Sequence, residues 1–166
     1  MPILRLSKAA LTAAVALYAS LVAFGNITDY GTNFAFVQHV FMMDTVFPTA
    51  TTRYRAIGTP LLHHIGYIAI IAAETVTAIL CWWGAFRLWR QRQAPARDFN
   101  RAKTVAIAGL TLGFLVWQVA FMSVGGEWFG MWMSSQWNGI ESAFRVFITI
   151  LAVLIYVALA NRELDA

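Results

Sequence analysis

Four long apolar stretches occupy most of this sequence and constrain its fold more than any other feature. They cover the ranges 9–25, 61–83, 104–124 and 140–160. A helix of about 20 apolar residues crosses the hydrocarbon layer of a bilayer and satisfies its own backbone polar groups there. An open strand would leave those groups bare in lipid. The sequence therefore predicts an all-α integral membrane protein, a four-helix bundle made of two antiparallel hairpins.

The composition excludes an ordinary water-soluble domain. Hydrophobic residues make up 60% of the 166 residues and charged residues only 12%, which is about half the charged fraction of soluble proteins. The sequence has no nucleotide-binding loop, no Ser-His-Asp order and no zinc-protease helix. Its one cysteine, Cys81, excludes an internal disulfide and a cysteine-based metal cluster. We therefore expect no catalytic residues, no metal ion and no enzymatic activity.

The positions of lysine and arginine predict the orientation. The range 84–103 has six basic residues and one acid, whereas the range 125–139 has no basic residue and the longer range 26–60 has two. Short positive loops stay in the cytoplasm. We therefore predict a bacterial inner-membrane protein with both termini and the 84–103 loop cytoplasmic, and with outer loops 26–60 and 125–139. The formal net charge of +4 then reflects topology and does not indicate nucleic-acid binding.

Within a single transmembrane domain, two shorter features refine the predicted architecture. The segment Asn33 to Met43 is too short to span the bilayer, so we expect a short interfacial helix in the first outer loop. Gly109 and Gly113 form a GxxxG pattern, which favours close contact between membrane helices. A cleavable signal peptide that ends before Asn26 is the alternative for the first apolar stretch.

Glu74 lies near the middle of the second predicted helix, where an ionised carboxylate is costly. It shares one face of that helix with His63, Tyr67 and Cys81, because their spacings are four and seven residues. Two alternatives are open. Glu74 is the centre of a proton or ion pathway, or it is neutral and hydrogen-bonded to threonine residues or to Gln118 on the third helix.

Arg145 lies about one turn inside the fourth predicted helix, and its guanidinium stays charged at any depth. Four acids lie at similar depth, namely Asp29, Asp44, Glu127 and Glu141. We predict that these five residues form an ion-pair network that ties the two outer loops together. Binding of an anion or substrate by Arg145 is the alternative.

Histidine and aromatic side chains concentrate at the same outer face. The third and fourth helices contain no histidine, so a haem held between facing helices is not expected. A surface for a ligand or a protein partner is the remaining interpretation. Its predicted members are His39, His63, Tyr67, Trp128, Trp132 and Trp137.

Several short motifs in the two outer loops carry a family resemblance. They are NITDY (26–30) with Asn33, FVQHV (36–40), MDT (43–45), GEWF (126–129), MW (131–132) and WNG (137–139), followed by Arg145. With these motifs the chain resembles a bacterial family of predicted small integral membrane proteins, catalogued as domain of unknown function 2165. The resemblance spans nearly the whole chain and implies a four-helix membrane protein of similar length. It implies no activity, cofactor or catalytic residue.

These features favour three functions. The first is a non-catalytic accessory or assembly subunit of a larger inner-membrane complex, such as a respiratory one, with other membrane subunits as partners. The second is a protein that binds a quinone or a phospholipid at the outer face. The third is the proton or ion pathway centred on Glu74. No cofactor is required by any of them, and membrane lipids are the expected surroundings.

Overall fold

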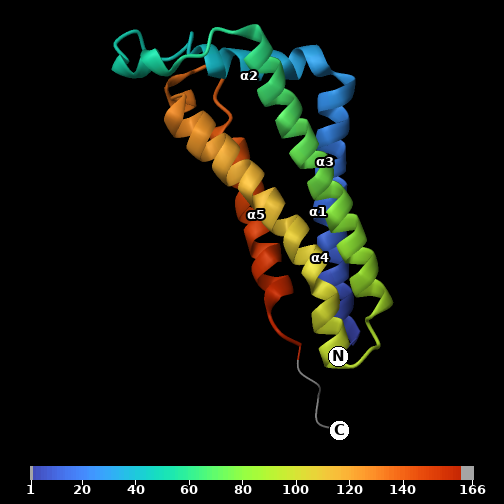
Figure 1. The fold of residues 1–166 in the computed structure, drawn as a ribbon. Coiled ribbons are helices and arrows are strands. Elements are labelled where there is room, and N and C mark those ends of the chain that lie inside the picture. The colour runs from blue at the N-terminus through green and yellow to red at the C-terminus, as the bar shows by residue number, and fades with distance from the viewer. Residues whose placement is uncertain (1, 162–166) are drawn as a thin grey trace.

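The computed structural model describes residues 2–161. All regular secondary structure in this range is helical (Figure 1). One shorter α-helix and two short turns lie between four long helical segments. In chain order the elements are α1 (Pro2–Thr28), α2 (Tyr30–Met42), η1 (Thr51–Arg55), α3 (Pro60–Arg90), α4 (Ala96–Leu115), η2 (Val116–Trp128), η3 (Met131–Met133) and α5 (Ile140–Ala158). The η1 and η3 elements are single 3₁₀ turns, and η2 is a π-helix that continues α4 without a break.

Four helical segments in this part of the chain are long and apolar enough to span a membrane, which confirms the predicted number. They are Ile3–Thr28, Pro60–Arg90, Ala96–Trp128 and Ile140–Ala158. The first three extend beyond the predicted ranges, and the predicted 84–103 loop shrinks to residues 91–95. Apolar composition marks only the part of a helix that lies in hydrocarbon, whereas the backbone hydrogen bonds continue through its polar ends. Sequence reasoning therefore placed these helix ends too far inside.

The long helices pack in the order α1, α3, α4 and α5, each against the next. The contact between α1 and α5 is much less extensive. Figure 1 shows η2 (orange) diverging from α3 (green), while α2 lies across that end of the bundle. We call it the α2 end, and we call the opposite end, where Asn161 lies, the terminal end. The bundle is therefore more open toward the α2 end.

Small residues bring α3 and α4 into close contact. A Cβ atom at Gly84 would lie 2.5 Å from the Ala106 Cα atom, and one at Gly109 would lie 2.9 Å from the backbone nitrogen of Cys81. Gly113 faces Thr77 in the same interface. The prediction that Gly109 and Gly113 form a helix contact is confirmed, because no larger residue would allow this approach.

Two buried lysines hold the last turn of α5 at the terminal end. Lys8 Nζ donates to the Leu159 carbonyl at 2.5 Å and to Asn161 Oδ1 at 3.1 Å, and Lys103 Nζ donates to the same carbonyl at 2.7 Å. Each lysine is only 3% exposed. Basic side chains stabilise a helix C-terminus by bonding its free carbonyl groups. Lys103, which the sequence assigned to a polar loop, is thus part of the packed bundle.

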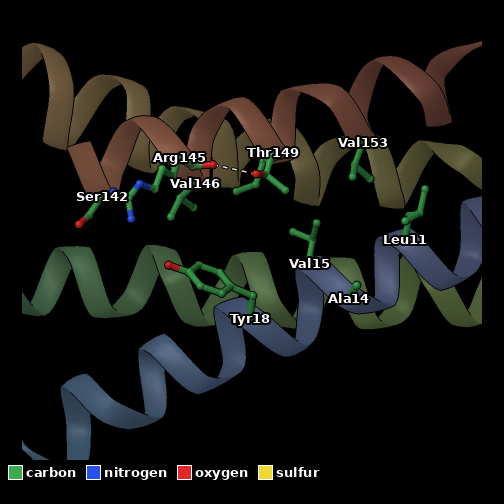
Figure 2. A pocket seen from close by; sticks show the side chains of 10 residues that line it. Leu11, Ala14, Val15, Tyr18, Ser142, Arg145, Val146, Thr149 and Val153 are labelled. Atoms are coloured by element: carbon green, nitrogen blue, oxygen red, sulfur yellow. Dashed lines mark hydrogen bonds between the residues drawn. The ribbon is translucent and has the colours of Figure 1, made fainter. Parts of the chain in front are cut away.

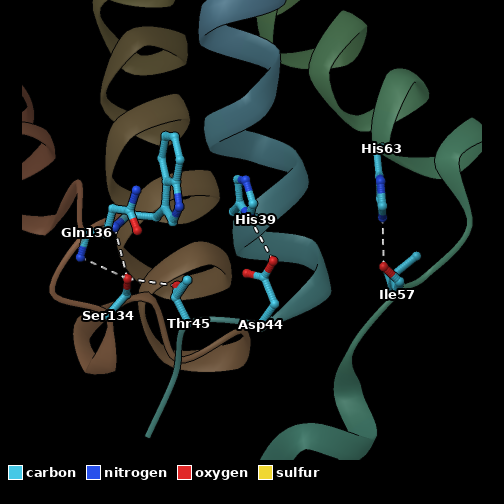
Figure 3. Close-up of polar contacts among 8 residues, drawn as sticks. His39, Asp44, Thr45, Ile57, His63, Ser134 and Gln136 are labelled. Atoms are coloured by element: carbon cyan, nitrogen blue, oxygen red, sulfur yellow. Dashed lines mark hydrogen bonds and ion pairs between the residues drawn. The ribbon is translucent and has the colours of Figure 1, made fainter.

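An apolar cluster that is separate from the core of the bundle lies beside α2. Val40 and Met43 pack there with Phe129 and Met131, which follow η2. The hydroxyl groups of Thr45 and Ser134 lie 2.8 Å apart and join the two connecting segments (Figure 3). Ser134 Oγ also accepts the backbone N–H of Trp137 at 2.8 Å. The long loops at the α2 end are therefore packed against each other.

We expect that Gly109→Val destabilises the protein by about 1–3 kcal/mol, the usual cost of overfilling a packed interface. The added side chain would overlap α3 at Cys81. Gly31→Val is the matched control, since a Cβ there meets no atom within 4 Å. Thermal unfolding in mild detergent measures both. Equal melting temperatures for the two variants would contradict the α3–α4 contact.

Candidate functional site

A groove lies between α1 and α5, two helices whose mutual contact is small. Its volume is about 500 Å³. Its lining residues are Leu11, Ala14, Val15 and Tyr18 of α1 with Ser142, Arg145, Val146, Thr149, Ile150 and Val153 of α5. We call it the α1–α5 groove. Most of its wall is apolar, and it is a candidate binding site for that reason.

The polar groups of the groove gather near one end. Figure 2 shows Ser142 and Arg145 at that end, Leu11 and Val153 at the other, and the Tyr18 hydroxyl pointing toward the polar end. The Tyr18 ring lies against Trp117 of η2, with 5.9 Å between ring centroids. The hydroxyls of Tyr18 and Ser142 have no hydrogen-bond partner within the described residues. Three donors are therefore available at this end.

Arg145 forms an ion pair with Glu141, one turn earlier on the same helix. The two side chains are 70% and 80% exposed, respectively. Thr149 does not contribute a free hydroxyl, because its Oγ1 donates to the Arg145 carbonyl at 2.7 Å. The charge at the polar end of the groove is therefore exposed and weakly held.

A second hollow, of about 520 Å³, lies beside the first turn of α5. It is lined by Met122, Trp132, Asn138, Ile140, Glu141 and Phe144. We call it the Trp132 hollow. Asn138 is held at its rim, since its Oδ1 accepts the Ile140 N–H at 3.1 Å.

The charged residues expected to form one network are not brought together. Within the described residues Arg145 pairs with Glu141 only, and Asp44 Oδ2 lies 2.7 Å from His39 Nδ1. Asp29 and Glu127 are exposed and make no ion pair in this part of the chain. The four acids belong to different segments of the α2 end, and apolar packing and hydroxyl groups join those segments instead of charge.

Glu74 is 1% exposed and faces α1. Asn26 Nδ2 donates to Glu74 Oε2 at 2.8 Å, and the Tyr67 hydroxyl donates to the Asn26 carbonyl at 3.0 Å. Sequence reasoning missed Asn26, which lies 48 positions earlier, and named threonine residues or Gln118 as the candidate partners. Gln118 is half-buried in η2, and its side chain makes no hydrogen bond within the described residues.

The contacts around Glu74 lead toward the α2 end. Above Tyr67, the Tyr30 ring lies at 4.7 Å, and its hydroxyl shares a hydrogen bond of 2.8 Å with His64 Nδ1. In the opposite direction the same face of α3 continues with Thr77, whose hydroxyl donates to its own helix, and with Cys81. Among the described residues, the chain of polar contacts therefore runs from Glu74 toward the α2 end and not toward the terminal end.

The six residues of the predicted ligand surface do not form one site. His39 stacks on Trp137 at 4.6 Å beside Asp44, whereas His63 is fully buried and its Nε2 donates to the Ile57 carbonyl at 2.6 Å (Figure 3). Tyr67 binds Asn26, Trp128 lies under Arg55, and Trp132 lines its own hollow. In residues 2–161 no group of three or more histidine, cysteine, aspartate or glutamate side chains could hold a metal ion.

The groove itself was missed from the sequence, apart from Arg145. Tyr18, Ser142 and Thr149 look like ordinary members of apolar helices. A weak signal was present, since Ser142, Arg145 and Thr149 recur every three or four residues and so share one face of α5. Nothing in the sequence shows that this face meets α1.

A family model described as a predicted small integral membrane protein (DUF2165) matches residues 4–160 of the chain. No curated protein and no solved structure matches it. The match covers all four membrane-spanning segments except Ile3.

Asn26→Ala should lower the free energy of unfolding by about 1–3 kcal/mol, because it removes the donor to the buried Glu74 carboxyl. The matched control is Asn33→Ala, which removes only an exposed hydrogen bond to the Asp29 carbonyl and should cost about 0.5 kcal/mol or less. A double-mutant cycle of Asn26→Ala with Glu74→Leu, followed by thermal unfolding, measures the coupling. Strictly additive losses would show that the two side chains do not interact.

Proposed function

Since the chain belongs to the DUF2165 family of predicted small integral membrane proteins, we propose from its geometry that it binds a lipid-like amphiphile in the α1–α5 groove. The class includes phospholipids and quinones, which combine a polar head with a long apolar chain. The observation that carries the proposal is the division of the groove into a donor-rich end, with Tyr18, Ser142 and Arg145, and an apolar end.

The size of the groove supports an amphiphile of this kind. Ligand sites in proteins commonly have volumes of about 300–1,000 Å³ and apolar walls with a few polar groups, and this groove holds about 500 Å³. Ser142 and Val153 are eleven residues apart on α5, which corresponds to about 16 Å along a helix. That length is close to half of the roughly 30 Å hydrocarbon layer. One chain of a lipid from a single leaflet would fit along it.

The position of the groove supports entry from the membrane. Its walls belong to two of the membrane-spanning segments, and the contact between them is much less extensive than the α1–α3, α3–α4 and α4–α5 contacts. A ligand can therefore enter sideways from the lipid without any helix having to separate. The Trp117 ring against Tyr18 would hold the phenol in place for the ligand head.

For orientation, we place the terminal end in the cytoplasm of a bacterium and the protein in its inner membrane. Arg5, Lys8 and most of the basic residues of the range 84–103 lie at the terminal end, and short basic segments remain inside. The α2 end then faces outward, and α2 lies along the outer membrane interface. The polar end of the groove would sit among the headgroups of the outer leaflet.

A role as an accessory or assembly subunit of a larger complex is the second candidate. It is favoured by exposed aromatic residues at the α2 end, namely Phe47, Tyr54, Trp128 and Trp132. Phe47 and Trp132 contact edge to face at 5.9 Å, and Arg55 lies over Trp128 at 4.7 Å. Aromatic residues and arginine are enriched in protein interfaces. Purification of the native protein in mild detergent tests this role, which fails if the protein migrates alone on a native gel.

Ala14→Trp should prevent retention of the amphiphile, because the indole would fill the groove. Ala72→Trp is the matched control, since Ala72 is exposed on α3 and outside the groove lining. Native mass spectrometry of protein released from nanodiscs counts the bound lipids and quinones. We expect occupancy to fall about tenfold in Ala14→Trp, which corresponds to a steric cost of 1.4 kcal/mol. Equal retention by both variants contradicts the proposal.

A further inference from the structure

The first two turns of α5 carry an acid and a base that belong to two different hollows. Arg145 lines the α1–α5 groove, and Glu141 lines the Trp132 hollow. Their ion pair joins a residue that lines one hollow to a residue that lines the other. One positive and one negative group are therefore presented side by side, at the end of the groove where a lipid head would lie.

Opening this ion pair costs little. Both side chains are more than two-thirds exposed, and exposed pairs one helical turn apart contribute little to stability. A phosphate can accept two parallel N–H bonds from the Arg145 guanidinium, whereas the pair with Glu141 uses only one guanidinium nitrogen. The phosphate of a lipid can therefore replace Glu141 at Arg145, with Ser142 as a nearby additional donor.

The charge of Glu141 limits which head is acceptable. Once a phosphate has taken its place at Arg145, the Glu141 carboxylate lies unpaired beside a second negative group. A head with a single negative charge would leave this repulsion uncompensated. A head that also carries a cation removes it, because the cation can bind Glu141 while the phosphate binds Arg145.

The Trp132 hollow has the groups that bind an ammonium ion. The rings of Trp132 and Phe144 are both about half exposed there, and Asn138 adds an amide oxygen. A carboxylate next to aromatic faces attracts a cation through charge and through the ring quadrupoles. A primary ammonium has three N–H donors, which suit Glu141 and Asn138.

We propose that the site selects a zwitterionic aminophospholipid of the phosphatidylethanolamine class, an inference that rests on lipid binding in the α1–α5 groove. The phosphate binds Arg145 and Ser142. The ammonium binds Glu141 in the Trp132 hollow. One acyl chain lies along the groove toward Val153, eight residues or about 12 Å deeper than Arg145. The site selects this head because α5 presents the Glu141 carboxylate for the ammonium next to the Arg145 guanidinium for the phosphate.

The test is competition between phosphatidylethanolamine and phosphatidylglycerol with identical acyl chains. The protein is placed in nanodiscs that contain equal amounts of both, and native mass spectrometry measures the ratio of the lipids that remain bound. Lipid that also remains on Ala14→Trp is subtracted as lying outside the groove. We expect phosphatidylethanolamine to be preferred about threefold, the size of one exposed charge pair.

Charge reversal supplies the decisive variant. Glu141→Lys should reverse the preference in favour of phosphatidylglycerol. Glu127→Lys makes the same change in net charge at an exposed residue that lines neither hollow, and it should leave the preference unchanged.

The outcomes separate the two proposals. Equal binding of both lipids, a preference for phosphatidylglycerol in the parent protein, or the same response in both lysine variants would overturn the selection of an aminophospholipid. In those cases lipid still occupies the groove. If no lipid is lost on Ala14→Trp, lipid binding in the groove itself is overturned.

Discussion

The close contact between α3 and α4 is the interaction on which the rest of this bundle depends. Gly84 and Gly109 let the two backbones approach to distances that a side chain would prevent. In lipid, helices associate through such packing, because exclusion of apolar surface from water gives no driving force there. With α1 held on the free side of α3 and α5 on the free side of α4, the two outer helices meet less extensively. The α1–α5 groove is a consequence of that arrangement.

The polar side chains of the bundle fall into two groups. Glu74, Asn26, Lys8 and Lys103 are hydrogen-bonded inside it, as buried polar groups must be. Tyr18, Ser142 and Arg145 are different, because the described fold does not use their donors except in the weak Arg145–Glu141 pair. Polar groups that a membrane fold leaves available beside an apolar groove are the natural candidates for ligand recognition.

The sequence predicted the features that depend on local composition. The four membrane-spanning segments follow from the length of the apolar stretches. The contact that Gly109 and Gly113 make with α3 follows from the small size of glycine. It did not predict features that depend on which helices meet. Asn26 as the partner of Glu74, the lysines that bond the end of α5, and Tyr18 opposite Arg145 all join distant parts of the chain. The π-helix η2 was also missed, since an apolar run of this kind fits an α-helix equally well.

The predicted five-residue ion network does not form, because similar depth in the membrane does not by itself bring side chains into contact.

Photo-crosslinking shows whether a lipid lies in the α1–α5 groove. A phospholipid with a diazirine in its acyl chain is activated in nanodiscs, and mass spectrometry of the digested protein maps the labelled residues. We expect labelling concentrated on groove residues such as Ala14, Val146 and Val153, with far less on Ala72 and Val76, which are exposed on α3. Uniform labelling of all outward-facing helix surfaces would show that the groove is ordinary lipid-exposed surface.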